Sequence, residues 1–253
     1  IAYSGGLDSR FLAHASQQFG FRAELLHING PHVPQEETEY ARRWAEAQHL
    51  PYREVLFDPL DLPEVASGSR ERCYGCKKGL FSALLKQTSL PLCDGTNASD
   101  MGHYRPGIRA VQELGIHSPL ADAGLTKDMI HHYAARTEME DWEQKPHPCL
   151  LTRLPYGMKP SRDLLYLLET GENGIRKIWT DAGMPEPDFR LRLVSDHLEL
   201  HFASGNGCCL SPAIKDQMTA YLLQAAPQFS QPCIIRQVEK LSGFFDSTQP
   251  VSL

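Results

Sequence analysis

Several features that would identify a membrane or secreted protein are missing from this sequence. No apolar run approaches the roughly 18 residues that a membrane-spanning helix requires, and no secretory signal peptide is visible. The formal net charge of −6 argues against general attraction to nucleic acids or anionic lipid surfaces, since both favour an excess of Lys and Arg. We therefore expect a globular protein with no nucleic-acid partner and no membrane partner.

Cysteine is present, but in a number that does not suit a disulfide framework. The chain has 7 cysteines among 253 residues, whereas disulfide-stapled folds are small secreted chains with paired cysteines. We predict a reducing, cytoplasmic location. Cys93 lies in the apolar segment LPLC, and Cys208, Cys209 and Cys233 are interpreted as structural residues.

Two well-known nucleotide-binding patterns are also absent, namely the lysine-containing Walker A loop and the dinucleotide motif G-x-G-x-x-G. The sequence instead has SGGLDS at 4–9, directly behind the apolar IAY. Adjacent glycines let the backbone turn tightly and point N–H groups at an anion. Ser4 and Ser9 can donate hydrogen bonds to phosphate, whereas Asp8 would repel it unless Mg²⁺ lay between them. An ordinary strand–helix turn is the alternative interpretation.

The first part of the chain alternates between strand and helix patterns. Strands are predicted at 22–28, 52–57 and 90–97, and helices at 35–50, 77–90 and 124–137. Thr126 is the expected cap of the last of these helices. Such alternation predicts an α/β fold with a doubly wound, Rossmann-like parallel sheet.

The pattern changes after about residue 155. Helices are predicted at 161–170 and 173–183, followed by strands at 189–195 and 197–203, a helix at 212–226 and a strand at 233–240. This order predicts a smaller C-terminal α+β domain. The expected domains are 1–157 and 158–253.

Three cysteines are candidates for chemistry. Cys73 and Cys76 form a C-x-x-C pair in RCYGCKK, and Cys149 stands between Pro148 and an apolar pair. A zinc knuckle needs four ligands, and no second C-x-x-C exists. A thioredoxin-like motif needs a different fold context. Two incidental thiols remain an open interpretation of the pair.

Two arginine pairs are candidates for anion binding. Arg105 and Arg109 lie in HYRPGIRA, while Arg190 and Arg192 share one face of a predicted strand because side chains alternate. Guanidinium groups match the geometry of phosphate and carboxylate. A surface loop and a solvated strand face are the alternatives for the two pairs.

The complete string SGGLDS after a strand resembles the PP-loop of the ATP pyrophosphatase superfamily, whose fold is of the adenine nucleotide alpha hydrolase type. Further along, RCYGCKKGLF, DGTNASDMGHYRPGIRAVQELGIHSPL, AGLTKDMIHHYA and CLLTRLPYG follow in the order and spacing of the LarE family. The similarity continues through RLRLVSDHLELHF near the C-terminus. It therefore spans almost the whole chain.

The resemblance implies an ATP-dependent sulfur transferase of nickel-pincer cofactor biosynthesis. Such enzymes adenylylate a carboxylate of pyridinium-3,5-biscarboxylic acid mononucleotide and then replace AMP by sulfur. In the three-cysteine type a [4Fe–4S] cluster is held by three thiolates, which leaves one iron open for an extra sulfide. The implied cofactors are ATP, Mg²⁺ and this cluster. The implied partners are a small-molecule substrate and further copies of the chain.

The resemblance also implies roles for individual residues. The catalytic and cluster-binding set is Cys73, Cys76 and Cys149, with Asp8 as a further catalytic residue. ATP and its Mg²⁺ are assigned to Ser4, Gly5, Gly6, Asp8, Ser9, His27, Asn29, Gly95, Thr96, Arg105 and Arg109. The substrate is assigned to Asp100, Tyr104, Thr152, Arg153, Arg190 and Arg192.

Two other functions remain open from the sequence. One is a different PP-loop enzyme, either a tRNA thiolase or an amidating synthetase. A tRNA enzyme is expected to carry a basic surface, which the net charge of −6 opposes, and an amidating synthetase needs no cysteine triad. The other is a nucleotide-binding module without catalysis, in which the three cysteines would be dispensable or would bind zinc.

Overall fold

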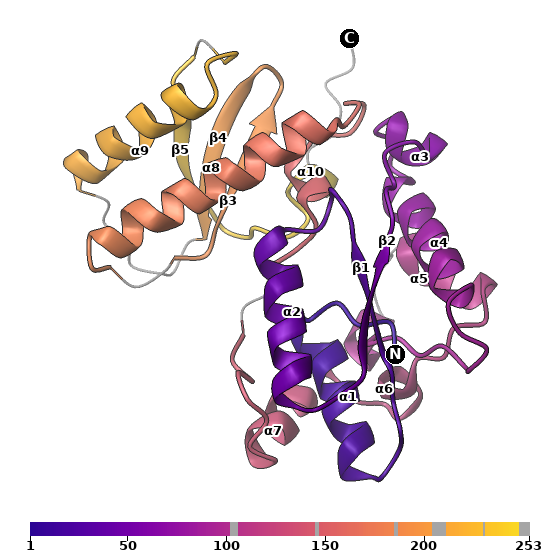
Figure 1. The fold of residues 1–253 in the computed structure, drawn as a ribbon. Helices are drawn as coiled ribbons and strands as arrows, with labels where there is room; N and C mark the ends of the chain where they lie inside the picture. The colour runs from indigo at the N-terminus through magenta and orange to yellow at the C-terminus, as the bar shows by residue number, and fades with distance from the viewer. Residues whose placement is uncertain (102–105, 145–146, 185–186, 204–210, 230, 248–253) are drawn as a thin grey trace. The chain divides into compact units, whose positions relative to one another are not determined.

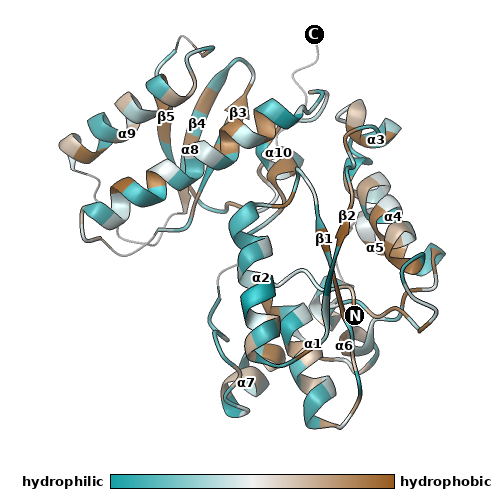
Figure 2. Ribbon diagram, in the orientation of Figure 1, coloured by the Kyte–Doolittle hydropathy of each residue, from teal (hydrophilic) through white to brown (hydrophobic). Residues whose placement is uncertain are grey.

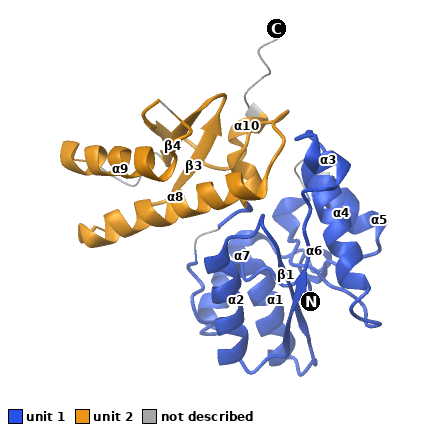
Figure 3. Cartoon of the chain, turned by 45° about the horizontal axis from the view of Figure 1, so that its top comes forward, with its two compact units in different colours: residues 1–149 blue, residues 150–253 orange. Residues whose placement is uncertain are grey.

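The computed structural model describes residues 1–101, 106–144, 147–184, 187–203, 211–229 and 231–247. The chain forms two compact units, residues 1–149 and 150–253, which Figure 3 shows in blue and orange. The sequence predicts a boundary after Gly157, whereas the observed division follows Cys149. The segment LLTRLPYG is therefore grouped with the second unit.

The first unit alternates strands and helices in the predicted order (Figure 1). Its elements are α1 (Leu7–Gln18), β1 (Leu25–Asn29), α2 (Gln35–Ala47), β2 (Tyr52–Leu56), α3 (Pro63–Ala66), α4 (Arg72–Leu85), η1 (Ala98–Asp100), α5 (Pro106–Glu113), α6 (Pro119–Asp122) and α7 (Lys127–Arg136). The Thr126 side chain accepts a hydrogen bond from the Met129 N–H. The predicted cap of α7 is thereby confirmed.

The parallel sheet of this unit extends beyond β1 and β2. These two strands pair in parallel from Leu25–Tyr52 to Asn29–Leu56. Ala2 forms a parallel bridge with Leu26, and its N–H donates to the Cys93 carbonyl at 2.7 Å. Cys93 in turn bridges to His117 in parallel. Numbered along the chain, the five extended segments therefore lie in the order 3-2-1-4-5.

This order reverses between the first segment, ending at Tyr3, and the fourth, ending at Asp94. Open parallel sheets bind ligands at such a switch point, beyond the carboxyl ends of the two strands concerned. The loops that leave these two ends are 4–9 and 94–97. The topology therefore brings together two segments that the sequence separates by about 90 residues.

Both faces of the sheet are covered, as the α/β prediction requires. Leu25 packs into a cluster with residues of α1, α2 and α7, including Phe11, Trp44 and Ile130. Leu26 and Ile28 point the other way, into a cluster with residues of α4 and α5. The alternation of side chains along β1 produces this division. The predicted doubly wound α/β class is confirmed.

The start of α4 differs from the prediction. A helix was expected from residue 77, but α4 begins at Arg72 and therefore includes Cys73 and Cys76. Gly75 lies against α3, where an added Cβ would stand 2.7 Å from Glu64 Oε2. Close packing of the two helices favours this early start. Residues three apart share a helix face, so both thiols lie on one side of α4.

The second unit is a small α+β fold. It contains η2 (Leu150–Arg153), α8 (Arg162–Asp181), β3 (Phe189–Val194), β4 (His197–Ala203), α9 (Pro212–Ala225), β5 (Ile234–Val238) and α10 (Phe244–Ser247). β3 pairs with β4 antiparallel, and β4 pairs with β5 in parallel. Hydrophobic residues follow β3 and β4 in Figure 2, and Phe202 packs against Trp179 of α8 with ring centroids 5.5 Å apart.

One continuous helix, α8, replaces the two helices predicted over 161–183. Ser161 caps it by accepting a hydrogen bond from the Leu164 N–H. α8 is 20 residues long, but Asp, Glu, Arg and Lys recur along it. Among the described helices, none combines the length and the apolar character that crossing a bilayer requires.

Candidate functional site

The loop of residues 4–9 is built around a glycine that no other residue can replace without strain. Gly5 has a φ of +83°, in the region that disfavours side chains. A Cβ on Gly5 would also stand only 2.8 Å from the Ala41 Cβ of α2. The loop is thereby pressed against α2, with the N-terminus of α1 at its far end.

Hydroxyl groups close the loop. The Ser9 hydroxyl donates to the Gly6 carbonyl at 3.0 Å and lies 3.2 Å from the Ser4 hydroxyl. The Ser4 N–H donates to the same Ser9 oxygen at 3.3 Å. This closed turn runs into the 12-residue helix α1, which begins at Leu7, and the amino end of a helix carries a partial positive charge. The arrangement suits a phosphate group.

The turn after Cys93 lies against this loop. A Cβ on Gly95 would be 2.9 Å from the Ser9 nitrogen, so only glycine allows the observed approach. The buried Asp94 carboxylate holds the turn, accepting from the Thr96 hydroxyl at 2.5 Å and from the Ser118 hydroxyl at 2.7 Å. Thr96 is thus bonded to its own turn, while Gly95 provides the contact with α1.

A cavity of about 590 Å³ lies over the two loops. Its polar border includes residues of both loops together with Asp100 and with side chains of α4 and α7. Apolar side chains also line the cavity, among them Leu26, Ile28, Val33, Leu80, Phe81 and Leu84. A site that combines a phosphate-suited turn with apolar lining residues fits a nucleotide.

Asp8 borders this cavity and has a partly unsatisfied carboxylate. Its Oδ1 is buried and has no hydrogen-bond partner among the described residues. Burial raises the pKa of Asp8 above its usual value, with Asp100 adding to the rise and Lys127 opposing it. A buried carboxylate oxygen without a donor is what a bound cation would satisfy. The residues present therefore fit a Mg²⁺ ion.

Cationic side chains near Asp8 come from α4 and α7, and the sequence patterns do not predict these side chains as site residues. Lys127 and His131 are four residues apart on α7, border the cavity and both lower the pKa of Asp8. Lys77 of α4 borders the cavity as well. In the sequence, Lys127 and His131 follow the Thr126 cap, and Lys77 follows Cys76. These positions alone do not place the three side chains at the cavity. The tertiary packing brings them to the border of the cavity over residues 4–9.

The three candidate thiols gather in the first unit. Cys76 is buried on α4 and Cys73 is exposed beside it. Burial raises the pKa of the Cys76 thiol, the charges of Cys149 and Cys73 raise it further, and Lys77 opposes them. None of the five described cysteines forms a disulfide. Cys76 and Cys149 are thus brought together by the fold although they are 73 positions apart in the sequence.

A single metal ion does not suit this group. Over the described ranges, no three His, Cys, Asp or Glu side chains are close enough to hold one ion. The ligands of a cubane cluster bind different irons and need not converge on one point. A cluster therefore requires less convergent ligands than a single ion does. Three thiols that are near enough to influence one another, one of them buried, meet this requirement.

The second unit carries a cluster of buried arginines. Arg153 is 1 % exposed and forms a two-pronged ion pair with Glu172, at 2.9 and 3.0 Å. Another Arg153 nitrogen donates to the Thr152 hydroxyl. The strand residues Arg190 and Arg192 are buried too, and the charge of Arg153 lowers the pKa of each.

Burial is the largest cause of these lowered values, and it brings the pKa of Arg192 to about 10. Arg190 donates to Asp188 at 2.8 Å. Three buried guanidinium groups repel one another here, while Glu172 pairs with Arg153 and Asp188 pairs with Arg190. Such a cluster suits an anion.

The chain is similar to three proteins over most of its length. An uncharacterized protein of Synechocystis sp. is 31% identical over 190 residues, covering 70% of each chain. An uncharacterized protein of Methanocaldococcus jannaschii is 30% identical over 180 residues, covering 70% of this chain and 68% of that one. The pyridinium-3,5-bisthiocarboxylic acid mononucleotide synthase of Lactiplantibacillus plantarum is 24% identical over 184 residues, covering 70% and 67%.

The chain belongs to the LarE family. This assignment makes it a nucleotide-using protein of the PP-loop superfamily and confirms the predicted resemblance. No protein-family model matches the chain. Two solved structures match the chain at a TM-score of 0.42 each. They are a predicted tRNA methyltransferase subunit of M. jannaschii (21% identity, 53% and 73% coverage) and an NMN synthetase of Francisella tularensis (11%, 91% and 86%).

Two residues assigned to ATP by the LarE resemblance have other partners here. His27 borders the cavity, but its Nδ1 lies 2.9 Å from the Tyr3 carbonyl and its Nε2 lies 3.0 Å from the Thr38 hydroxyl. Asn29 donates to Glu54 at 2.9 Å and is not among the residues that border the cavity. Both side chains thus support the sheet and α2.

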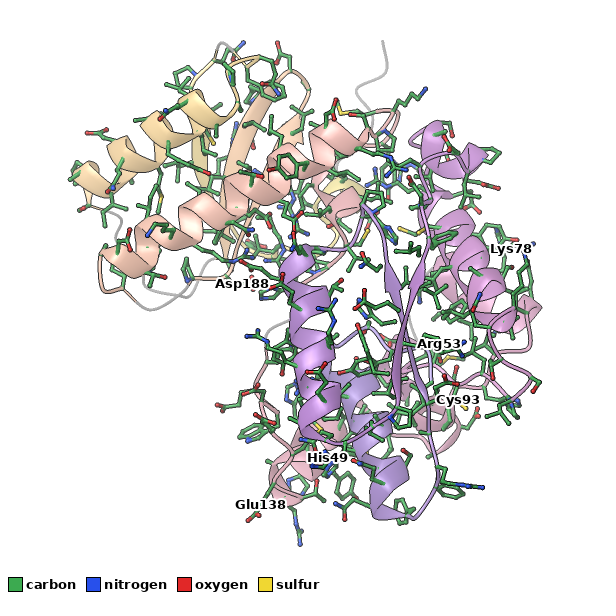
Figure 4. All side chains as sticks on the ribbon, in the orientation of Figure 1. His49, Arg53, Lys78, Cys93, Glu138 and Asp188 are labelled. Carbon is green, nitrogen blue, oxygen red and sulfur yellow. The ribbon has the colours of Figure 1, made fainter. Side chains whose placement is uncertain are left out.

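Arg109 of this LarE protein also lies away from the cavity. It pairs with Glu71 at 2.6 Å and stacks on the Tyr74 ring, with its guanidinium carbon 3.5 Å from the ring centre. Lys78 joins the same exposed group on the outer side of α4 (Figure 4). Tyr104 and Arg105, also predicted as site residues, lie outside the described residues.

Proposed function

We propose that this protein is an ATP-dependent sulfur transferase of nickel-pincer cofactor biosynthesis. It adenylylates a carboxylate of pyridinium-3,5-biscarboxylic acid mononucleotide, releases pyrophosphate, and replaces AMP by sulfur to give a thiocarboxylate. The observation that carries the proposal is the cavity over residues 4–9, with the unpaired Asp8 oxygen at its polar border. The name of the L. plantarum relative supports the choice of product.

ATP would lie with its phosphates on the loop and its adenine against the apolar lining residues. The hydroxyls of Ser4 and Ser9 and the amino end of α1 supply hydrogen bonds to the phosphates. Asp8 would hold Mg²⁺, with Asp100 as a second carboxylate. Mg²⁺ supplies positive charge that offsets the charge developing on pyrophosphate.

The cations of α4 and α7 have a separate task. A carboxylate oxygen of the substrate attacks the α-phosphorus, and the bond from that phosphorus to the bridging oxygen breaks as pyrophosphate leaves. Negative charge then grows on the leaving group. Lys127 and Lys77, which border the cavity, stabilise that charge directly. Preoriented charges of this kind are commonly the largest contribution to catalysis.

The sulfur would come from the cysteine site. Cys73, Cys76 and Cys149 would hold a [4Fe–4S] cluster, which supplies sulfide to the activated carboxyl carbon. The protein's part is to keep the three thiols together and to keep Cys76 buried. The mutual influence of their charges supports this role, because thiolates at close range repel one another unless they share a cation.

The arginine cluster of the second unit would bind an anionic group of the substrate mononucleotide. Arg190 and Arg192 lie on one face of β3, and Arg153 is held near them by Glu172. The proposal assigns the substrate phosphate to this cluster, because guanidinium groups offer paired donors to phosphate oxygens. Thr152, already bonded to Arg153, would set the position of that arginine.

The test uses the whole protein, purified and reconstituted without oxygen. Iron and labile sulfide are measured first, followed by pyrophosphate release from ATP with and without the pyridinium dicarboxylate mononucleotide. We expect about four irons per chain and pyrophosphate release that depends on the mononucleotide. Cys149→Ala should lose iron and thiocarboxylate formation but keep pyrophosphate release, whereas Cys93→Ala should keep all three.

The alternatives predict different results. Pyrophosphate release that responds to tRNA or to ammonia, and not to the mononucleotide, would identify another PP-loop enzyme. ATP binding without any pyrophosphate release would identify a binding module. A protein that takes up no iron after reconstitution contradicts the cluster, whatever its ATP chemistry.

A further inference from the structure

One face of the sheet in the second unit is lined by charged side chains. In the antiparallel pair β3–β4, Arg192 lies opposite Glu199 and Arg190 lies opposite His201. In the parallel pair β4–β5, His201 lies opposite Arg236. These five residues therefore share one face, while the alternate residues of β3 and β4 are buried and apolar.

Arg192 is the member of this face whose charge has no carboxylate partner. It is 2 % exposed, and in the part of the chain that the structure describes it forms no ion pair. One terminal nitrogen donates to the His201 ring and the other to the Leu241 carbonyl. Its Nε is buried without a partner, which leaves a donor available to a ligand.

The contacts of His201 determine where its proton lies. Its Nδ1 is 2.7 Å from the Arg192 guanidinium nitrogen, and since Arg192 can only donate, Nδ1 must accept. Its Nε2 is 2.6 Å from the Glu199 carboxylate, so Nε2 carries the hydrogen. The imidazole is thus neutral and in a single tautomer, and it sits edge-on to the Phe244 ring at 4.4 Å.

We propose that His201 is a positioning residue that aims Arg192 at an anionic group of the substrate, and that only its neutral form does so. This inference rests on the proposed role of the arginine cluster in binding the substrate phosphate. Protonation at Nδ1 places an N–H against the Arg192 N–H, so the hydrogen bond is lost and the two cations repel. Arg192 is then free to turn away, and the affinity for the anion falls in acid.

The groups around His201 favour the neutral form overall. Arg192 and Arg190 face it from β3, Glu199 and His197 from β4, and Arg236 from β5. From α10 it meets the Phe244 ring, while Asp246 is bonded to Tyr156. Glu199 is shared with His197 and Arg236. Burial lowers the pKa of His201 more than Glu199 raises it, and Arg192 lowers it further.

Two substitutions separate the two hydrogen bonds of His201. His201→Asn places an acceptor where Nδ1 stands but does not reach Glu199. His201→Gln places a donor where Nε2 stands but offers no acceptor at the Arg192 position. If His201 serves only as packing, the two variants should bind anions alike. If it positions Arg192, only His201→Asn should keep the affinity.

The experiment is calorimetric titration of the full chain with pyridinium-3,5-biscarboxylic acid mononucleotide and with inorganic phosphate, at pH 7.5 and pH 5.5. We expect His201→Asn to bind both near the wild-type level at pH 7.5, and His201→Gln to lose about ten- to a hundredfold in affinity. Titration of the ligand itself affects all proteins equally. The additional loss in acid should therefore appear in the wild type and be absent from His201→Asn.

Circular dichroism and thermal unfolding establish that each variant is folded. Equal affinity of His201→Gln and the wild type overturns the inference, and so does an acid loss that persists in His201→Asn. Failure of the proposed function looks different: the wild type then binds neither ligand in the second unit, and Arg192→Gln leaves mononucleotide affinity unchanged.

Discussion

At the scale of single residues, the candidate site depends on two positions in the phosphate loop for opposite reasons. Gly5 is required because its φ is positive and because α2 leaves no room for a side chain at this position. Asp8 is required because of a charge that the fold does not satisfy. A loop whose glycine is forced by packing, and in which one buried carboxylate oxygen lacks a hydrogen-bond partner, is suited to a ligand rather than to stability.

Gly5→Ala tests the first of these positions. The left-handed φ alone is expected to cost about 1 to 2 kcal/mol of unfolding free energy. The 2.8 Å approach to Ala41 adds to that and displaces the loop, so pyrophosphate release should be lost. Gly20→Ala is the matched control, since Gly20 also has a positive φ but nothing within 4 Å of an added Cβ. Urea unfolding should show only the φ cost there, with pyrophosphate release retained.

Asp8→Asn tests the second position. The pKa of Asp8 is raised by burial, so the ionised carboxylate destabilises the folded state above the unfolded pKa of about 3.9. Removing the charge should keep or raise the thermal midpoint at pH 7 while abolishing Mg²⁺-dependent pyrophosphate release. Thermal scans with and without Mg²⁺ and ATP measure both. A variant that still gains stability from Mg²⁺ would contradict the assignment.

At the scale of elements, buried cations join segments that are distant in the chain. Arg10 of α1 is fully buried and donates to the carbonyls of Gly5, Glu140 and Asp141. It therefore fixes the phosphate loop to the segment that follows α7. In the second unit, Arg153 and Glu172 join η2 to α8, and Glu172 also accepts from the Leu191 N–H of β3.

Arg10→Lys should destabilise the first unit even though the charge is kept. A lysine offers no planar fork, so at least one buried carbonyl is left without its donor, at a cost of about 2 to 3 kcal/mol. The control is Arg53→Lys, whose exposed pair with Glu24 is expected to contribute less than about 1 kcal/mol. Urea unfolding of both variants makes the comparison. Equal urea midpoints for Arg10→Lys and Arg53→Lys would show that Arg10 does not hold the loop in place.

Glu172→Gln tests the buried ion pair. The charge and hydrogen bonds of Arg153 hold the pKa of Glu172 below its usual value despite burial. The pair therefore stabilises the protein above the unfolded pKa of about 4.3, and that stability is lost as the pH falls below it. The variant should be about 3 to 5 kcal/mol less stable than the wild type at pH 7. It should also lack the part of the wild type's acid destabilisation that comes from protonation of Glu172.

Asp181→Asn is the matched control for the ion pair, because Asp181 and Lys177 are exposed partners on the same helix. Its effect on the unfolding free energy should stay within about 0.5 kcal/mol. Denaturant unfolding from pH 7 down to about pH 3 compares the wild type with both variants, because the loss is expected below the unfolded pKa of Glu172. Parallel pH profiles for the wild type and Glu172→Gln would show that another group is responsible.

At the scale of the whole molecule, two units carry different parts of the proposed chemistry. The cavity and the three thiols belong to residues 1–149, and the arginine face belongs to residues 150–253. Mg²⁺ and ATP should therefore slow amide hydrogen exchange in α1 and in the turn at Gly95, because ligands stabilise the units that bind them. Inorganic phosphate should instead protect β3 and β4. Protection of β3 by ATP alone would contradict this division.

Much of the secondary structure can be predicted from local sequence patterns. Apolar alternation and helical spacing locate most of the elements, and the Ser161 and Thr126 caps follow from side chains that satisfy free N–H groups. The family resemblance also rests on short local strings, such as SGGLDS and RCYGCKKGLF. Local patterns did not reveal that α4 begins at Arg72, because its start depends on packing between Gly75 and α3.

The sequence by itself therefore determined the α/β class, and it predicted the candidate phosphate loop at residues 4–9 and the three candidate cysteines. Only the tertiary structure decided which side chains share the cavity. It turned Lys127 and His131 toward Asp8, and it directed Arg109 outward to Glu71. The physical reason is that strand order and helix rotation arise from burying two apolar clusters at once. Contacts across that core join residues with no local relation in the chain.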